Sequence, residues 1–384
     1  MKSKFLRIAL TTFVLLLVSC SKDDNQTEIN EPSGTVKGTL TVKNGTKPVG
    51  GALVFVFDSK NEIHFTRTAA DGTFTLLAPA GQRNLYLQTG NGSNFRTTLE
   101  INVIKEETIT VDPTLCRLEQ VANMAYVPGS FDKIELIVQS LGYNITSITH
   151  NDLGNYATIS QYDIIFLNCG GKQNTLNAQI DTNLANFVTN GGSLYASDWA
   201  VAYLTGGGTN SNSCNLPFGF ISDDKMCAIN NGPSGYINGA TIPDANLAAA
   251  IGFSSLNIDY DLGSWEQINA YDPTFWEALV MNPANNQPLM VRNTDFSGGA
   301  VGTPVGGDDT GWVTICHHDE ASNSDITITI SASDWAVHQG HGDTLGPCQG
   351  NANSGTIYYT TFHNHASGNI GNTSYILEYV ILNL

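Results

Sequence analysis

The sequence is poor in basic residues, and this scarcity limits what the protein can bind. Of its 384 residues, 17 are Lys or Arg and 35 are Asp or Glu, and charged residues make up only 14% of the chain. Lys2, Lys4 and Arg7 stand at the start, which leaves 14 basic against 35 acidic residues and a net charge of −21 for the remainder. Nucleic acids and anionic membrane faces are bound through basic patches, so this balance disfavours both as partners.

Long hydrophobic runs are also scarce. Residues 8–18 form an apolar run that is short for a bilayer span, and no later stretch is apolar enough for a transmembrane helix. The run ends in LVSC at residues 17–20, which resembles the L-x-x-C lipobox of bacterial lipoproteins. The resemblance implies that residues 1–19 are a signal peptide and that Cys20 is acylated, so that lipid alone anchors the protein. An ordinary signal peptide and an uncleaved anchor are the alternatives.

The residues after Cys20 indicate the membrane face to which the protein is exported. The acidic patch SKDDN at residues 21–25 resembles an export signal that sends some lipoproteins to the outer face of the outer membrane. We therefore expect an outer-membrane lipoprotein at the cell surface, with the periplasmic face as the alternative. Residues 20–34 are polar, include Pro32 and are predicted to be a flexible tether.

Cysteine is infrequent, with seven in the chain. Without the lipidated Cys20, six remain, and an even number in an exported chain favours disulfides. Cys214 and Cys227 flank a short irregular loop and are candidates for one pair. Cys316 and Cys348 bracket a histidine-rich stretch and are candidates for another.

Residues 35–115 carry the pattern of a small all-β sandwich. Short alternating runs are separated by turn signals such as Asn44-Gly45 and Asp71-Gly72. The stretches GTVKGTLTV, KPVGGALVFVF and TAADGTFTLLAPAG resemble the carboxypeptidase regulatory-like, transthyretin-like domain. The resemblance implies a seven-stranded spacer or binding module without an active site.

Residues 120–384 alternate between strand and helix patterns, which predicts an α/β domain with a parallel sheet covered on both faces. Helices are expected over residues 130–143, 176–192 and 373–384, and a further one over residues 269–280. We expect loops over about 205–255 and 293–310. The aromatic residues of the whole region between the helix over 176–192 and the C-terminal stretch are predicted either to stack on sugars or to pin the loops: Phe218, Tyr236, Trp265 and Trp276.

The α/β pattern resembles the class I glutamine amidotransferase-like domains, which are flavodoxin-like in fold. The matching stretches are YDIIFLNCGG, the helix that ends in Gly191-Gly192, and TTFHN near the C-terminus. In that family a G-x-C-x-G turn presents a cysteine nucleophile. This chain instead has ASDW at residues 196–199, where the bulk of Trp199 argues against a strained turn. The cysteine nucleophile is therefore absent.

One catalytic pair remains as an alternative. His363 stands where the family has its histidine, but His365 occupies the family's glutamate position. Ser197 and His363 are thus candidates for a hydrolase pair, and the competing prediction for Ser197 is a helix N-cap. The word ASDWAV occurs at residues 196–201 and again at 332–337, and at both places we expect a strand to give way to a helix.

The densest chemical cluster is an insert at residues 311–349. It resembles a module of exported bacterial proteins with the form V-T-I-C-H…H-x-x-H-G-D…C, and the resemblance implies no activity. Thiolates and imidazoles suit zinc or another divalent metal. Three hypotheses stay open: a Cys316–Cys348 disulfide among packed histidines, zinc bound through both thiolates, or a disulfide beside a separate metal site. The residues of that separate site are His317, His338, His341 and Asp343.

These patterns favour a surface-anchored lipoprotein with a non-catalytic role in binding a glycan or a protein. The rival hypothesis is a hydrolase of glycan or peptide that uses either metal at the insert or the pair Ser197 and His363. The two hypotheses differ in a spatial expectation. If His317, His338 and His341 meet His363 and His365 in one open pocket, the hydrolase is favoured, and if the insert lies far from that edge of the sheet, binding is favoured.

Overall fold

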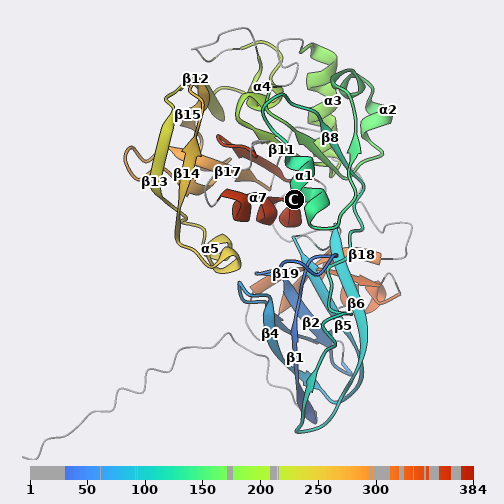
Figure 1. The fold of residues 1–384 in the computed structure, drawn as a ribbon. Coiled ribbons are helices and arrows are strands. Elements are labelled where there is room, and N and C mark those ends of the chain that lie inside the picture. The colour runs from blue at the N-terminus through green and yellow to red at the C-terminus, as the bar shows by residue number, and fades with distance from the viewer. Residues whose placement is uncertain are drawn as a thin grey trace, which may run out of the picture.

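In a computed structural model, the chain is multidomain and mostly β, with several sheets and some helices (Figure 1). Cys20, His341, Cys348 and His365 lie outside the described residues, so the lipid anchor and part of the predicted insert site do as well. The structure describes residues 31–60, 62–90, 92, 94–170, 176–207, 214, 216–294, 296, 312–319, 324–331, 333–340, 343–345, 354–364 and 373–384.

Seven strands between residues 33 and 110 form two sheets that share a core. They are β1 (Ser33–Thr39), β2 (Leu53–Phe57), β3 (Ile63–Arg67), β4 (Thr73–Pro79), β5 (Gly81–Thr89), β6 (Phe95–Val103) and β7 (Thr108–Thr110). One sheet has the order β4-β1-β7 and the other β3-β2-β5-β6. Phe74, Leu76 and Ala78 alternate along β4 and are buried against Val54 and Leu85 of the second sheet. This period of two is what a strand with one buried face requires.

The larger part of the chain is built on a nine-stranded sheet of order β14-β13-β16-β17-β21-β11-β10-β8-β9. Strands β9, β8, β10, β11 and β21 run parallel to one another, whereas the pairs β21–β17, β17–β16, β16–β13 and β13–β14 are antiparallel. The sheet is therefore mixed and not purely parallel as predicted. Its strands are β8 (Met124–Val127), β9 (Thr146–Ser147), β10 (Ile164–Leu167), β11 (Ser193–Ser197), β13 (Gly235–Thr241), β14 (Ser255–Tyr260), β16 (Glu277–Met281), β17 (Pro288–Asn293) and β21 (Ile357–Thr360).

The helix predicted over residues 269–280 is wrong. That segment holds the end of β15 (Trp265–Tyr271), a turn, and the start of β16. Asp272 Oδ1 accepts the Thr274 N–H at 2.8 Å, a local bond that competes with helical pairing and turns the chain. The region predicted as loops over 205–255 follows α4 (Ala202–Thr205) and also contains regular structure, namely β12 (Met226–Gly232), β13 and α5 (Ala245–Ile251).

Helices cover both faces of the sheet. On one face, apolar residues of α1 (Ile134–Ser140) and α7 (Thr373–Asn383) join the core that continues into the sandwich. On the other, α3 (Ala178–Thr189) packs Ile180, Leu184 and Phe187 into a second core. The remaining short helices are η1 (His150–Gly154), α2 (Tyr156–Ile159) and η3 (Asp198–Val201). In the part of the chain that the structure describes, no helix is long and apolar enough to cross a membrane.

The histidine-rich insert folds back onto the N-terminal sandwich (Figure 1). Its elements are β18 (Trp312–Asp319), β19 (Ser324–Ser331), α6 (Trp335–Gly340) and β20 (Thr344–Leu345), with sheet order β19-β18-β20. Ile315, Ile328 and Ile330 are buried against Phe55 and Tyr86 of the sandwich. Both copies of ASDWAV mark a strand-to-helix change, from β11 to η3 and from β19 to α6.

Candidate functional site

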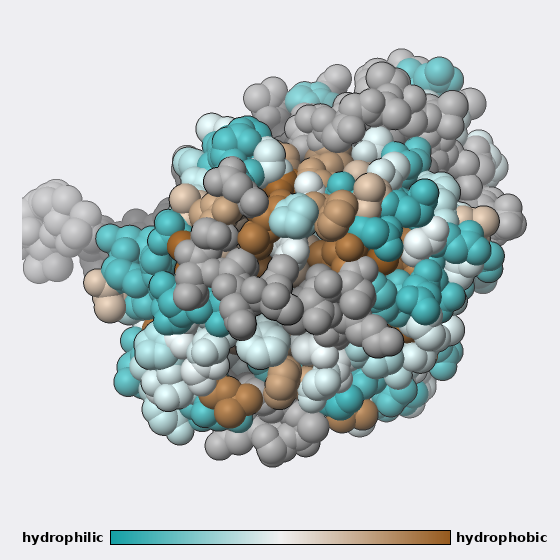
Figure 2. All heavy atoms as spheres, turned by 90° about the horizontal axis from the view of Figure 1, so that it is seen from above, coloured by the Kyte–Doolittle hydropathy of each residue, from teal (hydrophilic) through white to brown (hydrophobic). Residues whose placement is uncertain are grey.

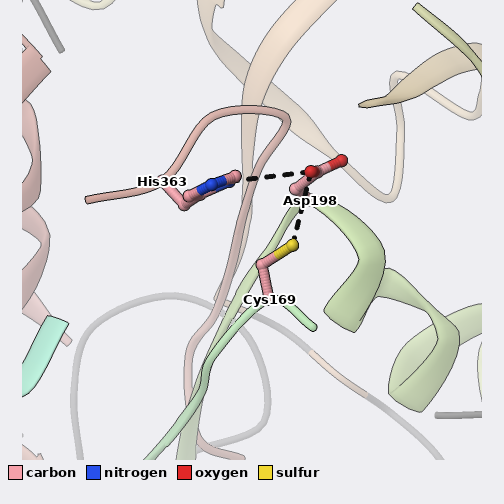
Figure 3. Close-up of side chains that lie close together, drawn as sticks. All are labelled: Cys169, Asp198 and His363. Atoms are coloured by element: carbon pink, nitrogen blue, oxygen red, sulfur yellow. Dashed lines mark hydrogen bonds and ion pairs between the residues drawn. The ribbon is translucent and has the colours of Figure 1, made fainter. Parts of the chain in front are cut away.

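Three side chains meet where three neighbouring parallel strands end. Cys169 follows β10, Asp198 follows β11 and His363 follows β21. The Asp198 Oδ2 lies 3.4 Å from Cys169 Sγ and 3.6 Å from His363 Nδ1, so both contacts end on one carboxylate oxygen (Figure 3). All three residues are buried. In open α/β sheets, the carboxyl ends of the strands are the usual place for a ligand site.

Asp198 stands at the apex of a sharp strand-to-helix turn. Its φ is 45°, in the left-handed region that non-glycine residues seldom adopt and that Asp tolerates better than most. The argument that Trp199 precludes a strained turn is therefore wrong. The indole leaves the turn, donates Nε1–H to Ser264 O at 2.7 Å and meets the Phe131 ring edge to face at 5.4 Å.

The carboxylate of Asp198 is fixed and shifted toward its neutral form. Its Oδ1 accepts the Glu266 N–H at 2.7 Å, and the residue is 4% exposed. Burial raises the pKa of Asp198 to about 8. Burial also raises the pKa of Glu266 to about 7, and burial together with the charge of Asp198 raises that of the Cys169 thiol well above its ordinary value. Perturbed acids that converge in this way are typical of functional sites.

Ser197 takes part in a buried hydrogen-bond network behind Asp198. Its hydroxyl donates to Asp132 and accepts the Cys169 N–H at 3.1 Å. Asp132 is fully buried, accepts the Asn364 N–H at 3.1 Å, and has its pKa raised to about 7 by burial. Ser197 occupies the N-cap position of η3 as predicted, but its side chain makes no capping hydrogen bond. The structure brings His363 to Asp198, the residue after the predicted partner.

A cavity of ≈ 290 Å³ opens beside Asp198 and His363. Tyr260 and Trp265 lie on its wall as a stacked pair with ring centroids 4.0 Å apart. The full lining is Phe131, Asp198, Trp199, Asp259, Tyr260, Asp261, Leu262, Gly263, Ser264, Trp265, Phe362 and His363. Seen from the α3 and α4 side of the molecule, hydrophobic residues gather toward the middle, with hydrophilic residues around them (Figure 2). The cavity thus combines aromatic surfaces with acidic groups.

The insert residues form a separate cluster. The Nδ1 atoms of His317 and His338 each lie 2.7 Å from Asp343 Oδ2. Burial acts to raise the pKa of Asp343, but the hydrogen bonds from both imidazoles hold it below the ordinary value. The His338 ring packs against Phe57 of the sandwich at 5.2 Å. Residues of the insert take no part in the lining of the cavity at His363, so within the described residues the expected common pocket does not form.

The other predicted residues fall at different places. Cys214 and Cys227 form a disulfide, and Cys316 is also disulfide-bonded. Trp265 lines the cavity, whereas Trp276 is 1% exposed inside a core. Phe218 and Tyr236 are exposed on the surface.

Sequence reasoning did not single out Cys169, Asp198, Asp132 or Glu266 as site residues. Cys169 and Asp198 did carry a usable signal. Each directly follows a short apolar strand of the parallel type, so both were bound to reach the same sheet edge. Asp132 and Glu266 stand in loop and antiparallel strand positions, and no comparable local pattern marks them.

Comparison with known proteins gives only distant neighbours. No family model matches the sequence, and no curated protein matches it. A "putative carbohydrate binding protein" from Bacteroides uniformis ATCC 8492 has 13% identity over 24% of this chain and 45% of its own, with a TM-score of 0.19. A DUF3823 family protein from Parabacteroides merdae ATCC 43184 has 15% identity over 24% of this chain and 49% of its own, with a TM-score of 0.19. The chain thus spans about half the length of these two.

A third neighbour covers more of the chain. It is a "putative thua-like protein" from Bacteroides uniformis ATCC 8492, with 13% identity over 68% of this chain and 88% of its own, and a TM-score of 0.32.

Proposed function

We propose that the chain is an outer-membrane lipoprotein, anchored through Cys20 and exposed at the cell surface, that binds a small carbohydrate without transforming it. The binding site is the cavity beside Asp198. The observation that carries this proposal is the lining, in which Trp199, Tyr260 and Trp265 stand beside Asp259 and Asp261. The N-terminal sandwich serves as a spacer between the lipid and this site.

Both components of the lining suit a sugar. One face of a pyranose ring consists of C–H groups, which pack against flat aromatic surfaces, and rigid aromatic side chains lose little entropy on binding. The hydroxyl groups of the sugar donate hydrogen bonds to carboxylates, and such charge-assisted bonds are stronger than neutral ones. A cavity of ≈ 290 Å³ is at the small end of ligand pockets, which suits a single sugar unit or the end of a chain.

The charge of the lining selects among sugars. Three aspartates line the cavity, and Lys and Arg are absent from its lining in the part of the chain that the structure describes. In the metal-free protein, an anionic sugar would meet the carboxylates of Asp259 and Asp261 without a compensating cation. We therefore expect neutral or amino sugars as ligands, and uronic or sialic acids to bind at least about tenfold more weakly, a penalty of about 1.4 kcal/mol.

The test is binding of a panel of neutral, amino and acidic glycans to the full chain carrying Cys20→Ser, which prevents lipidation, after metal has been removed with a chelator. Trp265→Ala removes one aromatic wall and should weaken binding of the sugar that the wild type retains by at least about tenfold. Tyr375→Ala is the matched control, because Tyr375 is 47% exposed on α7 and outside the cavity. Equal loss in both variants, or binding of acidic sugars alone, contradicts the proposal.

A hydrolase is the second candidate, and the backbone of Asp198 is the observation that favours it. A side chain presented at φ 45° on a strand-to-helix turn, with an imidazole 3.6 Å away, has the arrangement of a nucleophile and its base. Hydrolysis of chromogenic glycosides and esters by the wild type, abolished in Asp198→Asn, supports this candidate. Uniform inactivity of the wild type, with glycan binding retained, supports the binding role.

A further inference from the structure

We propose that Cys169, Asp198 and His363 form a zinc site with one coordination position open to the cavity. The thiol sulfur of Cys169, a carboxylate oxygen of Asp198 and a ring nitrogen of His363 all lie within 4.8 Å of one another. This site differs from the one predicted for the insert. It is also independent of the carbohydrate proposal, because metal binding can be measured without any sugar.

The spacing of these atoms matches a tetrahedral ion. With Zn–S of about 2.3 Å and Zn–N or Zn–O of about 2.0–2.1 Å, tetrahedral angles place neighbouring ligand atoms about 3.3–3.6 Å apart. The distances from Asp198 Oδ2 are 3.4 Å to the sulfur and 3.6 Å to the nitrogen. These two separations are those expected for ligands of one tetrahedral ion, and the sulfur and the imidazole lie within 4.8 Å of each other.

The insert cluster has a different spacing. His317 and His338 approach Asp343 Oδ2 at 2.7 Å, which is the length of a strong hydrogen bond and is shorter than the separation of two zinc ligands. The carboxylate of Asp343 thus links the two imidazoles directly. Because the separations at Asp198 suit a zinc ion and those at Asp343 suit hydrogen bonds, we place the metal at Asp198 and give the histidines of the insert a structural role.

Two of the three ligands, Cys169 and Asp198, are held by surrounding contacts. Phe131 N–H donates to Cys169 O at 3.1 Å, and Gly129 lies so close that a Cβ there would stand 2.0 Å from the same oxygen. Glu266 N–H occupies Asp198 Oδ1, which leaves Oδ2 directed at the thiol and the imidazole. Outer contacts of this kind orient metal ligands and raise affinity.

The ligand types select the ion. A thiolate with an imidazole and a carboxylate is a borderline-soft set that suits zinc and disfavours Mg²⁺ and Ca²⁺, which prefer oxygen ligands alone. Three protein ligands leave the fourth position of a tetrahedral ion for water or a ligand oxygen, and the cavity lies on that side because Asp198 and His363 both line it. Since the ion must displace the thiol proton, its affinity falls as the pH is lowered.

The test uses the full chain carrying Cys20→Ser, stripped with chelator and then titrated with Zn²⁺ and Co²⁺. We expect one ion per chain and, with Co²⁺, the sulfur-to-metal absorption band of a bound thiolate. Cys169→Ser should abolish the band, whereas Cys116→Ser, at the other buried free cysteine, should retain it. His363→Ala should abolish 1:1 zinc binding, and it decides the matter if Cys169→Ser does not fold.

Two results overturn the proposal. The first is the absence of zinc binding by the folded wild type. The second is 1:1 binding that survives both Cys169→Ser and His363→Ala, or that disappears in His338→Ala, because the ion would then lie elsewhere or in the insert. Glycan binding that fails while zinc binding persists rejects the carbohydrate proposal alone.

Discussion

Asp198 Oδ2 lies 3.4 Å from Cys169 Sγ, and both groups are buried at the ends of adjacent parallel strands. In the absence of a metal, burial of this kind favours the protonated form of both groups, which explains the direction of both pKa shifts. The same two groups are suited to lose their protons to an ion. The protonation of Asp198 and of the Cys169 thiol therefore affects both the stability of the fold and the proposed binding of zinc.

The stability of the metal-free protein should fall as the pH rises from about 4 to about 8. The ordinary pKa of Asp198 is 3.8 and the folded value is about 8. Below pH 4 the group is neutral in both states, and between these values only the folded state holds the proton, so rising pH favours unfolding. Each pH unit within the gap costs about 1.4 kcal/mol for this one group.

Chemical unfolding at each pH checks this prediction, with two variants compared. Asp198→Asn should flatten the decline up to pH 8. Asp132→Asn should flatten it only up to about pH 7, where that carboxyl ionises in the folded protein. A decline that is identical in wild type and Asp198→Asn shows that the buried carboxyl is not protonated.

Replacing Ser197 should cost stability and not ligand binding. The substitution Ser197→Ala leaves the Cys169 N–H and a carboxylate oxygen of Asp132 without their partner in a fully buried position. We expect a loss of about 1–3 kcal/mol in the free energy of unfolding. Thr360→Val is the control, because it removes another buried hydroxyl, which donates to Phe362 O. Loss of a hydrolytic activity without loss of stability would instead make Ser197 a nucleophile.

The thiol count should be two per chain after denaturation without reductant, in the protein carrying Cys20→Ser. Cys214 pairs with Cys227, Cys316 is bonded to one further cysteine, and Cys116 and Cys169 are free, which accounts for all six. In the native state both free thiols should react slowly, because burial raises the pKa of Cys116 to about 11 and that of Cys169 well above its ordinary value. A count of four would mean that the disulfide of Cys316 is not formed.

The contact between insert and sandwich should contribute measurably to stability. Ile328 is fully buried against Phe55 and Tyr86, so Ile328→Ala should cost about 2–5 kcal/mol. Val337→Ala, in the same insert but 39% exposed, should change stability by no more than about 0.5 kcal/mol. Unfolding midpoints and limited proteolysis measure both. Equal effects would show that the insert does not dock on the sandwich in solution.

Local signals were enough to predict much of the fold. The turn at Asp71-Gly72 is formed as its sequence indicates, with Thr73 N–H donating to Asp71 and Gly72 at φ 77°. The strands β8, β10, β11 and β21 are short apolar runs, and all four lie next to one another in the sheet. Helix α5 carried overlooked signals, since Asp244 caps its start and Gly252 ends it in the left-handed conformation.

The predictions that failed concern contacts between segments far apart in the sequence, which no short segment reveals. Pairing of β17 with β21 joins segments that the insert separates in sequence, so the antiparallel half of the sheet could not be read from alternation alone. Docking of the insert on the sandwich also joins segments that are far apart in the sequence. At the site, the choice between Ser197 and Asp198 depends on one backbone angle, because φ 45° at Asp198 decides which side chain reaches His363.

A crystal structure of the protein soaked with zinc and with its glycan ligand tests the central claim most directly, since that claim is that the functional site is the cavity beside Asp198. We predict an anomalous zinc peak bounded by Cys169, Asp198 and His363, and sugar density against Trp265. Zinc between His317 and His338 with sugar elsewhere on the surface would contradict the account.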